Sequence, residues 1–192
     1  MNRCEWVTSD PLYLCYHDEE WGVPVKDDRK LFELLVLEGA QAGLSWLTVL
    51  KKRENYREAF YGFDVDKVSA MTERDVIRLK GNEGIIRNER KIRSAIQNAQ
   101  KVKELQQVYG SFSSYIWGFV GGEVIQNVWK SHKEVPASTL LSDKISKELK
   151  RQGFSFVGST ICYSFMQAAG MVNDHIISCF RHKECGELPG TK

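Results

Sequence analysis

Apolar residues recur with helical spacing along most of the chain. The clearest segment is 88–109, whose apolar residues lie three or four positions apart: Ile92, Ile96, Ala99, Val102 and Leu105. Residues with this spacing share one face of an α-helix, because the helix turns once every 3.6 residues. The segment therefore predicts an amphipathic helix that buries one face.

Other segments give helical patterns of different strength. Clusters or faces of apolar residues predict helices around 31–37, over 44–60, over 142–151 with a stop at Gly153, and over 157–172. The last is apolar on most sides, which predicts a buried helix. Thr72 and Asp75 have the spacing of a capping box that opens a short helix. The alternation typical of strands is nearly absent, so the expected fold class is all-α.

Length and composition are typical of one compact domain. The chain has 192 residues, of which 42% are hydrophobic and 27% charged, too apolar for a disordered chain. Apolar runs stay well short of the roughly 18–20 residues that a membrane helix needs, so no membrane partner is expected. The first residues, MNRCEWV, lack the basic and then apolar pattern of a secretory signal, which predicts a cytoplasmic protein.

The net charge of +2 hides an uneven distribution. The segment 17–38 has seven acidic and three basic residues, whereas 87–103 has six basic and one acidic. A charge run by itself is more often a solvated helix face than a binding surface. The total charge therefore neither predicts nor excludes a nucleic-acid partner.

A glycine-containing turn precedes the basic helix. Gly81 and Gly84 lie three apart, and the helix begins near Asn88. Unpaired amides at a helix N-terminus bind anions, and Arg87, Arg90 and Lys91 would stand beside them. The segment from about 76 to 100 resembles the helix-hairpin-helix motif, which grips a DNA backbone without reading its sequence. An ordinary turn between helices with a glycine C-cap explains the segment equally well.

Two cysteines and two histidines near the chain ends form a candidate metal site: Cys4, His17, His175 and Cys179. His175 and Cys179 lie four apart, which on a helix places both on one face. Two thiolates and two imidazoles are the usual tetrahedral zinc ligands, and such a set leaves no position for water. The set predicts one structural Zn²⁺ ion that ties the two ends of the chain together.

Burial explains the same residues without a metal. His175 and Cys179 suit a protein core, and His182 with Cys185 offers a rival pair. The odd count of five cysteines argues against a disulfide framework in a protein of this kind. Cys15 and Cys162 lie among apolar residues and are expected to be buried free thiols.

Aromatic residues concentrate in the first quarter of the chain, around one acid. They are Trp6, Tyr13, Tyr16, Trp21 and Trp46. Flat aromatic walls with one carboxylate, Glu38, suit a flipped purine, which stacks on the rings and donates N–H groups to the acid. A positively charged alkylated base gains further from the aromatic faces. Taken alone, such aromatics are more often core residues, and a glutamate is more often on the surface.

Several stretches together resemble one family. They are 3–6 (RCEW), 10–24 (DPLYLCYHDEEWGVP), 37–46 (LEGAQAGLSW), 153–158 (GFSFVG) and 173–175 (NDH). In this order they closely resemble the DNA-3-methyladenine glycosylase I family over about residues 1–180. The resemblance implies the helix-hairpin-helix glycosylase fold as a single domain over 1–183. It also implies a zinc subdomain from about 1–25 plus 155–183, with a tail over 184–192.

The resemblance also implies site residues and an activity. It places the zinc ligands at Cys4, His17, His175 and Cys179. It makes Glu38 the residue that recognises the base at the reacting centre. It also places Tyr16 and Trp46 in the pocket, which Trp6, Tyr13 and Trp21 support or line. The implied activity is flipping of 3-methyladenine out of double-stranded DNA that contains alkylated bases. Hydrolysis of its N-glycosidic bond then yields the free base. A monomer is expected.

One stretch departs from the wider superfamily that this family resembles. Many of its members have Val-Asp-x-His, whereas this chain reads Val172-Asn173-Asp174-His175. On a helix the shift by one residue turns the acid by about 100°, so Asp174 is not assigned as a general base. No lysine matches a motif for Schiff-base chemistry, which predicts hydrolysis without strand cleavage.

Two other functions fit parts of the pattern. A zinc-stapled helical module would bind damaged DNA through the hairpin and release no base. An enzyme acting on free nucleosides would use the aromatic pocket and would not need Arg87, Arg90 or Lys91.

Overall fold

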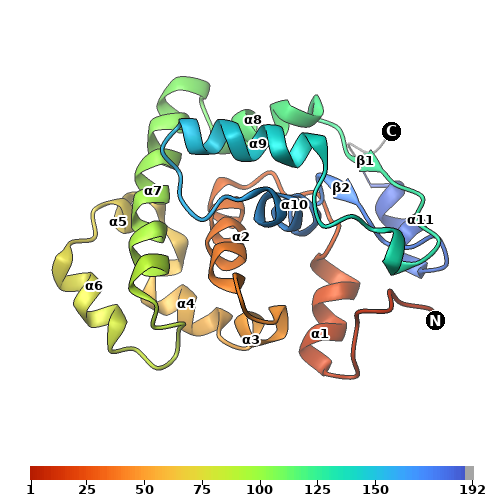
Figure 1. Ribbon diagram of the computed structural model, residues 1–192, viewed down its shortest axis with the longest axis horizontal. Coiled ribbons are helices and arrows are strands. Elements are labelled where there is room, and N and C mark those ends of the chain that lie inside the picture. The colour runs from red at the N-terminus through yellow and green to blue at the C-terminus, as the bar shows by residue number, and fades with distance from the viewer. Residues whose placement is uncertain (189–192) are drawn as a thin grey trace.

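The computed structural model describes residues 1–188 and is mostly helical, which confirms the expected all-α class (Figure 1). The α-helices are α1 (Pro11–Cys15), α2 (Asp28–Gln41), α3 (Trp46–Leu50), α4 (Arg53–Ala59), α5 (Val65–Ser69), α6 (Glu73–Lys80), α7 (Glu89–Tyr109), α8 (Phe112–Trp117), α9 (Leu140–Arg151), α10 (Ser159–Ala168) and α11 (Phe180–Gly186). A π-helical turn (Tyr16–Glu20) follows α1, and short 3-10 turns cover Tyr61–Phe63, Gly118–Val120 and His132–Glu134.

Helix α2 forms the centre of the fold (Figure 1). Ten consecutive residues of this helix, 31–40, are buried, including Glu33 and Glu38. A helix that is buried on all sides needs partners on all sides. Helices α7, α8 and α10 pack against it, so Glu38 lies in the interior of the protein.

The long amphipathic helix is confirmed as α7. Asn88 caps it by accepting a hydrogen bond from the Lys91 N–H, and the chain leaves it at Gly110, whose φ is +82°. All five apolar residues of the predicted face are buried. The capping box of Thr72 and Asp75 is also confirmed and opens α6.

Two predicted helices are wrong in extent. The segment 44–60 divides into α3 and α4, because Lys52 leaves helical geometry between them (φ −100°, ψ 1°). The helix expected over 157–172 ends at Ala168, and Val172–Asn173 (β2) pairs in parallel with Ile125–Gln126 (β1). Gly170 makes this turn possible, since its φ is +65° and a Cβ there would lie 2.3 Å from the Val23 carbonyl carbon.

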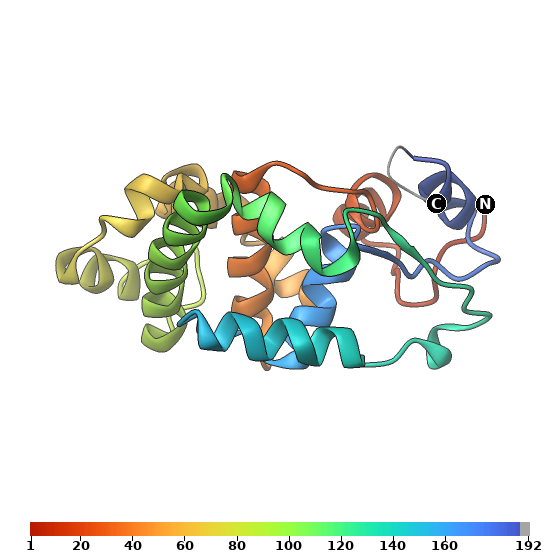
Figure 2. The ribbon, with the colours of Figure 1, turned by 90° about the horizontal axis from the view of Figure 1, so that it is seen from above.

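Both ends of the described chain lie at the same end of the molecule (Figure 2). The Phe180 N–H donates to the Asn2 carbonyl at 3.1 Å, which joins the start of α11 to the N-terminal segment. Residues 184–186, expected to belong to a tail, are part of α11, and Cys185 is fully buried. The disorder expected around Pro189 falls outside the described residues. Within residues 1–188 no helix is long and apolar enough to cross a membrane.

Candidate active site and metal cluster

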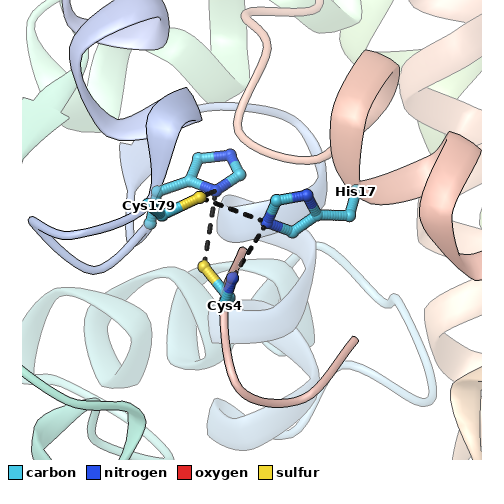
Figure 3. A group of neighbouring side chains, drawn as sticks. Cys4, His17 and Cys179 are labelled. Carbon is cyan, nitrogen blue, oxygen red and sulfur yellow. Dashed lines mark hydrogen bonds between the residues drawn. The ribbon is translucent and has the colours of Figure 1, made fainter. Parts of the chain in front are cut away.

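The structure brings the four predicted metal ligands together in the interior. Figure 3 labels three of them, Cys4, His17 and Cys179. Cys4 comes from the N-terminal segment, His17 from the π-helical turn, and His175 and Cys179 from the segment between β2 and α11. Their ligand atoms lie within 4.8 Å of one another, and all four residues are buried. This buried group of two thiols and two imidazoles can hold a metal ion.

The distances within the cluster fit a tetrahedral ion. The Cys4 Sγ lies 3.5 Å from His175 Nδ1, and the Cys179 Sγ lies 3.5 Å from His17 Nε2 and 3.6 Å from His175 Nδ1. Zinc with bonds of about 2.3 Å to sulfur and 2.0–2.1 Å to nitrogen requires a sulfur–nitrogen separation of about 3.6 Å at the tetrahedral angle. The hydrogen bond from Cys4 lowers the pKa of the Cys179 thiol, which favours the thiolate that a metal binds.

Neighbouring groups orient both imidazoles toward the cluster. His17 Nδ1 lies 2.7 Å from an Asp18 carboxylate oxygen, and His175 Nε2 lies 2.9 Å from the Trp21 carbonyl oxygen. Such partners fix which ring nitrogen faces a metal. Asp18 is in turn held by Arg3, which lowers the pKa of that carboxyl to about 2. The cluster therefore presents Nε2 of His17 and Nδ1 of His175.

His175 and Cys179 meet, but not on one face of a helix as their spacing predicted. The segment 174–179 is a non-helical turn, and Cys179 is the N-cap of α11. The rival residue His182 instead lies 2.8 Å from the Asn127 carbonyl oxygen. Of the two thiols expected to be buried and free, Cys162 is buried but Cys15 is exposed.

All six predicted pocket residues line one cavity of about 150 Å³: Trp6, Tyr13, Tyr16, Trp21, Glu38 and Trp46. The rings of Trp6 and Tyr13 meet edge to face at 5.2 Å between centroids, and those of Tyr16 and Trp46 lie 5.3 Å apart. A second cavity of about 360 Å³ shares Glu38 and opens along 41–45. Glu38 therefore lies where an aromatic slot meets a wider groove.

Glu38 has no charged partner in the described part of the chain. Its exposed fraction is 4%, and burial raises the pKa of its carboxyl from the ordinary 4.5 to about 8. A buried carboxyl without a cation is costly to ionise, and a cationic ligand in the adjoining slot would remove that cost. The site is thus suited to a flat, positively charged group.

Asp174 does not face the cavity as a free acid. Asn173 lies in β2 and Asp174 follows it, so the 100° rotation expected for a helix does not apply. The Asp174 side chain is 1% exposed and accepts hydrogen bonds from four side chains: Asn127, Trp129, Tyr163 and Gln167. These bonds occupy both carboxylate oxygens.

The hairpin joins α6 to α7 as expected, but its glycines serve a different purpose. The φ of Gly81 is −84°, and neither glycine has a positive φ. A Cβ on Gly84 would lie 2.9 Å from the Asn55 side chain, so glycine permits close packing there. The N–H groups of Gly81, Asn82 and Gly84 already donate to protein acceptors. Contrary to the expectation from the sequence, these three N–H groups of the turn are therefore not available to bind an anion.

The three basic residues beside the hairpin differ in their surroundings. Arg87 and Arg90 are exposed. Lys91 points into the protein, where its ammonium donates to the Ala40 and Ala42 carbonyls at 2.8 and 2.6 Å, and burial lowers its pKa. The sequence predicts that Lys91 stands beside the turn and holds a phosphate, but in this structure the carbonyls at the end of α2 bind its ammonium.

Comparison with known proteins decides the family. The family model described as methyladenine glycosylase matches residues 6–182. The chain belongs to the methyladenine glycosylase family. It is 54% identical over 179 residues to DNA-3-methyladenine glycosylase 1 of Escherichia coli (strain K12), with 93% of this chain and 96% of the relative covered.

Solved structures of this glycosylase family share the fold. A crystal structure of 3-methyladenine DNA glycosylase I superimposes with a TM-score of 0.91 at 55% identity, covering 93% of this chain and 98% of that one. A variant of 3-methyladenine DNA glycosylase I in complex with 3-methyladenine gives a TM-score of 0.91 at 40% identity, covering 94% and 97%.

Sequence reasoning missed four polar residues of this glycosylase cavity: Gln41, His132, Ser164 and Gln167. Gln41 lies one turn after Glu38 on α2, so helical spacing could have found it. Ser164 and Gln167 share a face of α10 for the same reason, but nothing in the sequence shows that this face meets α2. His132 begins the 3-10 turn His132–Glu134 after β1, and nothing in the local sequence points to the cavity.

Proposed function

We propose that this chain excises 3-methyladenine from double-stranded DNA. The observation that carries the proposal is the buried carboxyl of Glu38 in a member of the methyladenine glycosylase family. It lies among aromatic side chains and has no cationic partner in residues 1–188. The base leaves the DNA stack, enters the cavity and stacks on the rings, while Glu38 accepts its N–H groups. Similarity to a glycosylase solved with 3-methyladenine supports the same base as ligand and product.

The chemistry needs little help from an acid or base. Methylation at N3 places a positive charge on the adenine, so the bond from C1′ to the base breaks with its electron pair moving to the base. Water then adds to the sugar carbon and loses a proton, which leaves an abasic site and neutral 3-methyladenine. Glu38 recognises the base and stabilises its charge in this scheme. Asp174 is fully engaged and does not activate the water.

Strand cleavage is not part of the proposal. Cleavage by a lyase requires an amine nucleophile at the sugar. No lysine lines either cavity at Glu38 in the described structure. The expected product is therefore an abasic site in an unbroken strand.

DNA binding is proposed for the surface around the turn between α6 and α7, which is called the hairpin face. Arg87 and Arg90 are exposed there and would contact phosphates beside the turn that contains Gly81 and Gly84, and Gly84 lets this turn pack closely against Asn55. Lys91 supports this face indirectly by tying α7 to the end of α2. The protein would act as a monomer, as one domain over 1–183.

The metal in the cluster is proposed to be zinc. Its ligands would be Cys4, His17, His175 and Cys179, whose chemistry and spacing fit a closed tetrahedral site. Such a site supplies stability and no reacting group. It would join the segments 1–25 and 155–183 into a subdomain, which places Tyr16, Trp21 and the aromatic slot beside the metal.

One incubation separates this proposal from its rivals. Duplex DNA treated with a methylating agent is mixed with the protein, and the released bases are identified by chromatography. Release of 3-methyladenine is expected. Binding to the DNA without release would instead indicate a damage-binding module. Release from free nucleosides, unchanged by Arg87→Ala and Arg90→Ala, would indicate a nucleoside hydrolase.

A further inference from the structure

Asp174 is the centre of a buried hydrogen-bond network, and within residues 1–188 it has no ion pair with a cationic side chain. One of its oxygens accepts from Asn127 Nδ2 at 2.6 Å and Trp129 Nε1 at 2.8 Å. The other accepts from the Tyr163 hydroxyl at 2.6 Å and Gln167 Nε2 at 2.8 Å. The network joins the loop after β1 to α10 and to the segment that leads into the metal cluster.

This network fixes the orientation of one side-chain amide in the base cavity. A carboxylate accepts hydrogen bonds and does not donate them, so Gln167 must turn its NH₂ group toward Asp174. Gln167 lines the cavity, and its Oε1 has no hydrogen-bond partner in residues 1–188. The cavity therefore contains a neutral acceptor, Oε1 of Gln167, and the amide cannot flip to present its NH₂ group there instead. Gln41, the other amide in the cavity, has no such partner in that range.

We infer that Gln167 is a specificity residue that accepts a hydrogen bond from the exocyclic amino group of the flipped base, and that Asp174 is the positioning residue that holds it in this orientation. The inference rests on the proposed function. The amino group at position 6 is the only N–H donor of a 3-methyladenine nucleotide's base, so an acceptor in the cavity has no other hydrogen to bind. Its two hydrogens suffice for Glu38 and Gln167 together.

The same arrangement selects against a carbonyl at position 6. A base with an oxygen at position 6 would place that oxygen against Oε1 of Gln167, so two acceptors would face each other. A site that binds an N–H group has much lower affinity for an analogue without that N–H group. The free base 3-methylhypoxanthine, with a carbonyl at position 6, is a suitable probe.

Asp174→Asn should reverse the polarity of the amide. Trp129 Nε1 can only donate, so the new amide keeps its oxygen toward Trp129 and turns its NH₂ toward Tyr163 and Gln167. The Tyr163 hydroxyl can rotate to accept. Gln167 then gains a bond by flipping its own amide, which turns its NH₂ group into the cavity.

The experiment measures the affinities of free 3-methyladenine and 3-methylhypoxanthine by calorimetry for the wild type and three variants. Asp174→Asn is expected to weaken 3-methyladenine binding about tenfold and to shift the ratio of the two affinities toward 3-methylhypoxanthine by about tenfold or more. Gln167→Met, which keeps the length but removes the acceptor, is expected to weaken 3-methyladenine binding about tenfold. It relieves the contact between two acceptors but offers the analogue no donor, so 3-methylhypoxanthine should gain less affinity than in Asp174→Asn. Gln167→Met also tests the inference if Asp174→Asn fails to fold.

Tyr163→Phe is the matched control. It removes another hydrogen bond from the same carboxylate oxygen and leaves Gln167 with its acceptor, so the affinity ratio should not change. Metal content and melting temperature are recorded for every variant. An unchanged ratio in folded Asp174→Asn, or unchanged 3-methyladenine binding in Gln167→Met, overturns the inference. The wild-type release of 3-methyladenine tests the proposed function separately.

Discussion

Replacing Glu38 with glutamine should stabilise the protein, and more so as the pH rises. Glu38 is 4% exposed and has no cation in the described structure, and burial raises the pKa of its carboxyl from 4.5 to about 8. The unfolded chain ionises this group at a lower pH than the folded protein does. The raised pKa of Glu38 therefore contributes to the free energy of unfolding. This contribution is fully present below pH 4.5 and is lost as the pH rises toward 8.

The magnitude follows from the difference between the two pKa values. At about 1.4 kcal/mol for each pKa unit, the shift from 4.5 to about 8 corresponds to about 5 kcal/mol as an upper bound. Glutamine has nearly the same shape and does not ionise. The advantage of Glu38→Gln over the wild type should therefore grow by several kcal/mol between about pH 5 and about pH 9.

Denaturant unfolding at a series of pH values measures this difference. The control is Glu58→Gln, which removes a charge from an exposed residue of α4 that has no ion pair in residues 1–188. The control should follow the wild type at every pH. Parallel curves for Glu38→Gln and the wild type would refute the reasoning, because they would show that Glu38 ionises equally easily in both states.

Three further predictions concern the rest of the molecule. Cys179→Ser, or removal of metal by a chelator, should lower metal content and destabilise the fold by several kcal/mol, and full occupancy with an unchanged melting temperature would count against the cluster. Arg87→Ala and Arg90→Ala should each reduce the slope of log K against log salt for DNA binding by about 0.9, whereas Lys91→Met should lower stability and leave that slope unchanged. Gly170→Ala should lower the free energy of unfolding by more than about 3 kcal/mol, because the new Cβ would meet the Val23 backbone. Gly122→Ala, where φ is also positive but the space is open, should lower it by about 1 kcal/mol, and equal losses would contradict the packing argument.

Local signals in the sequence were reliable where the structure depends on neighbours in the chain. Helix α7, its Asn88 cap and the capping box of α6 all follow from residues within one or two helical turns. The end of α10 does not, because Gly170 is required by the backbone of Val23, which lies far away in the sequence. Periodicity alone therefore extended this helix into β2.

The candidate site shows the same division. Residue types and the family resemblance predicted both the group of two cysteines and two histidines and the residues of the aromatic slot. His175 and Cys179 nevertheless meet across a turn and not on a helix. Gln167 and Lys91 differ because their environments depend on distant partners. Asp174 fixes the side chain of Gln167, and the carbonyls at the end of α2 bind Lys91. Such partners carry no local signal, so the sequence could not assign them.

The central claim is that this chain removes 3-methyladenine by hydrolysis. It is tested most directly by counting products on one batch of methylated duplex DNA, with released bases measured by chromatography and abasic sites by strand breakage after alkali. The account predicts one abasic site for each released 3-methyladenine and unbroken strands before alkali. Absence of released 3-methyladenine, or strand breaks that form without alkali, would contradict it.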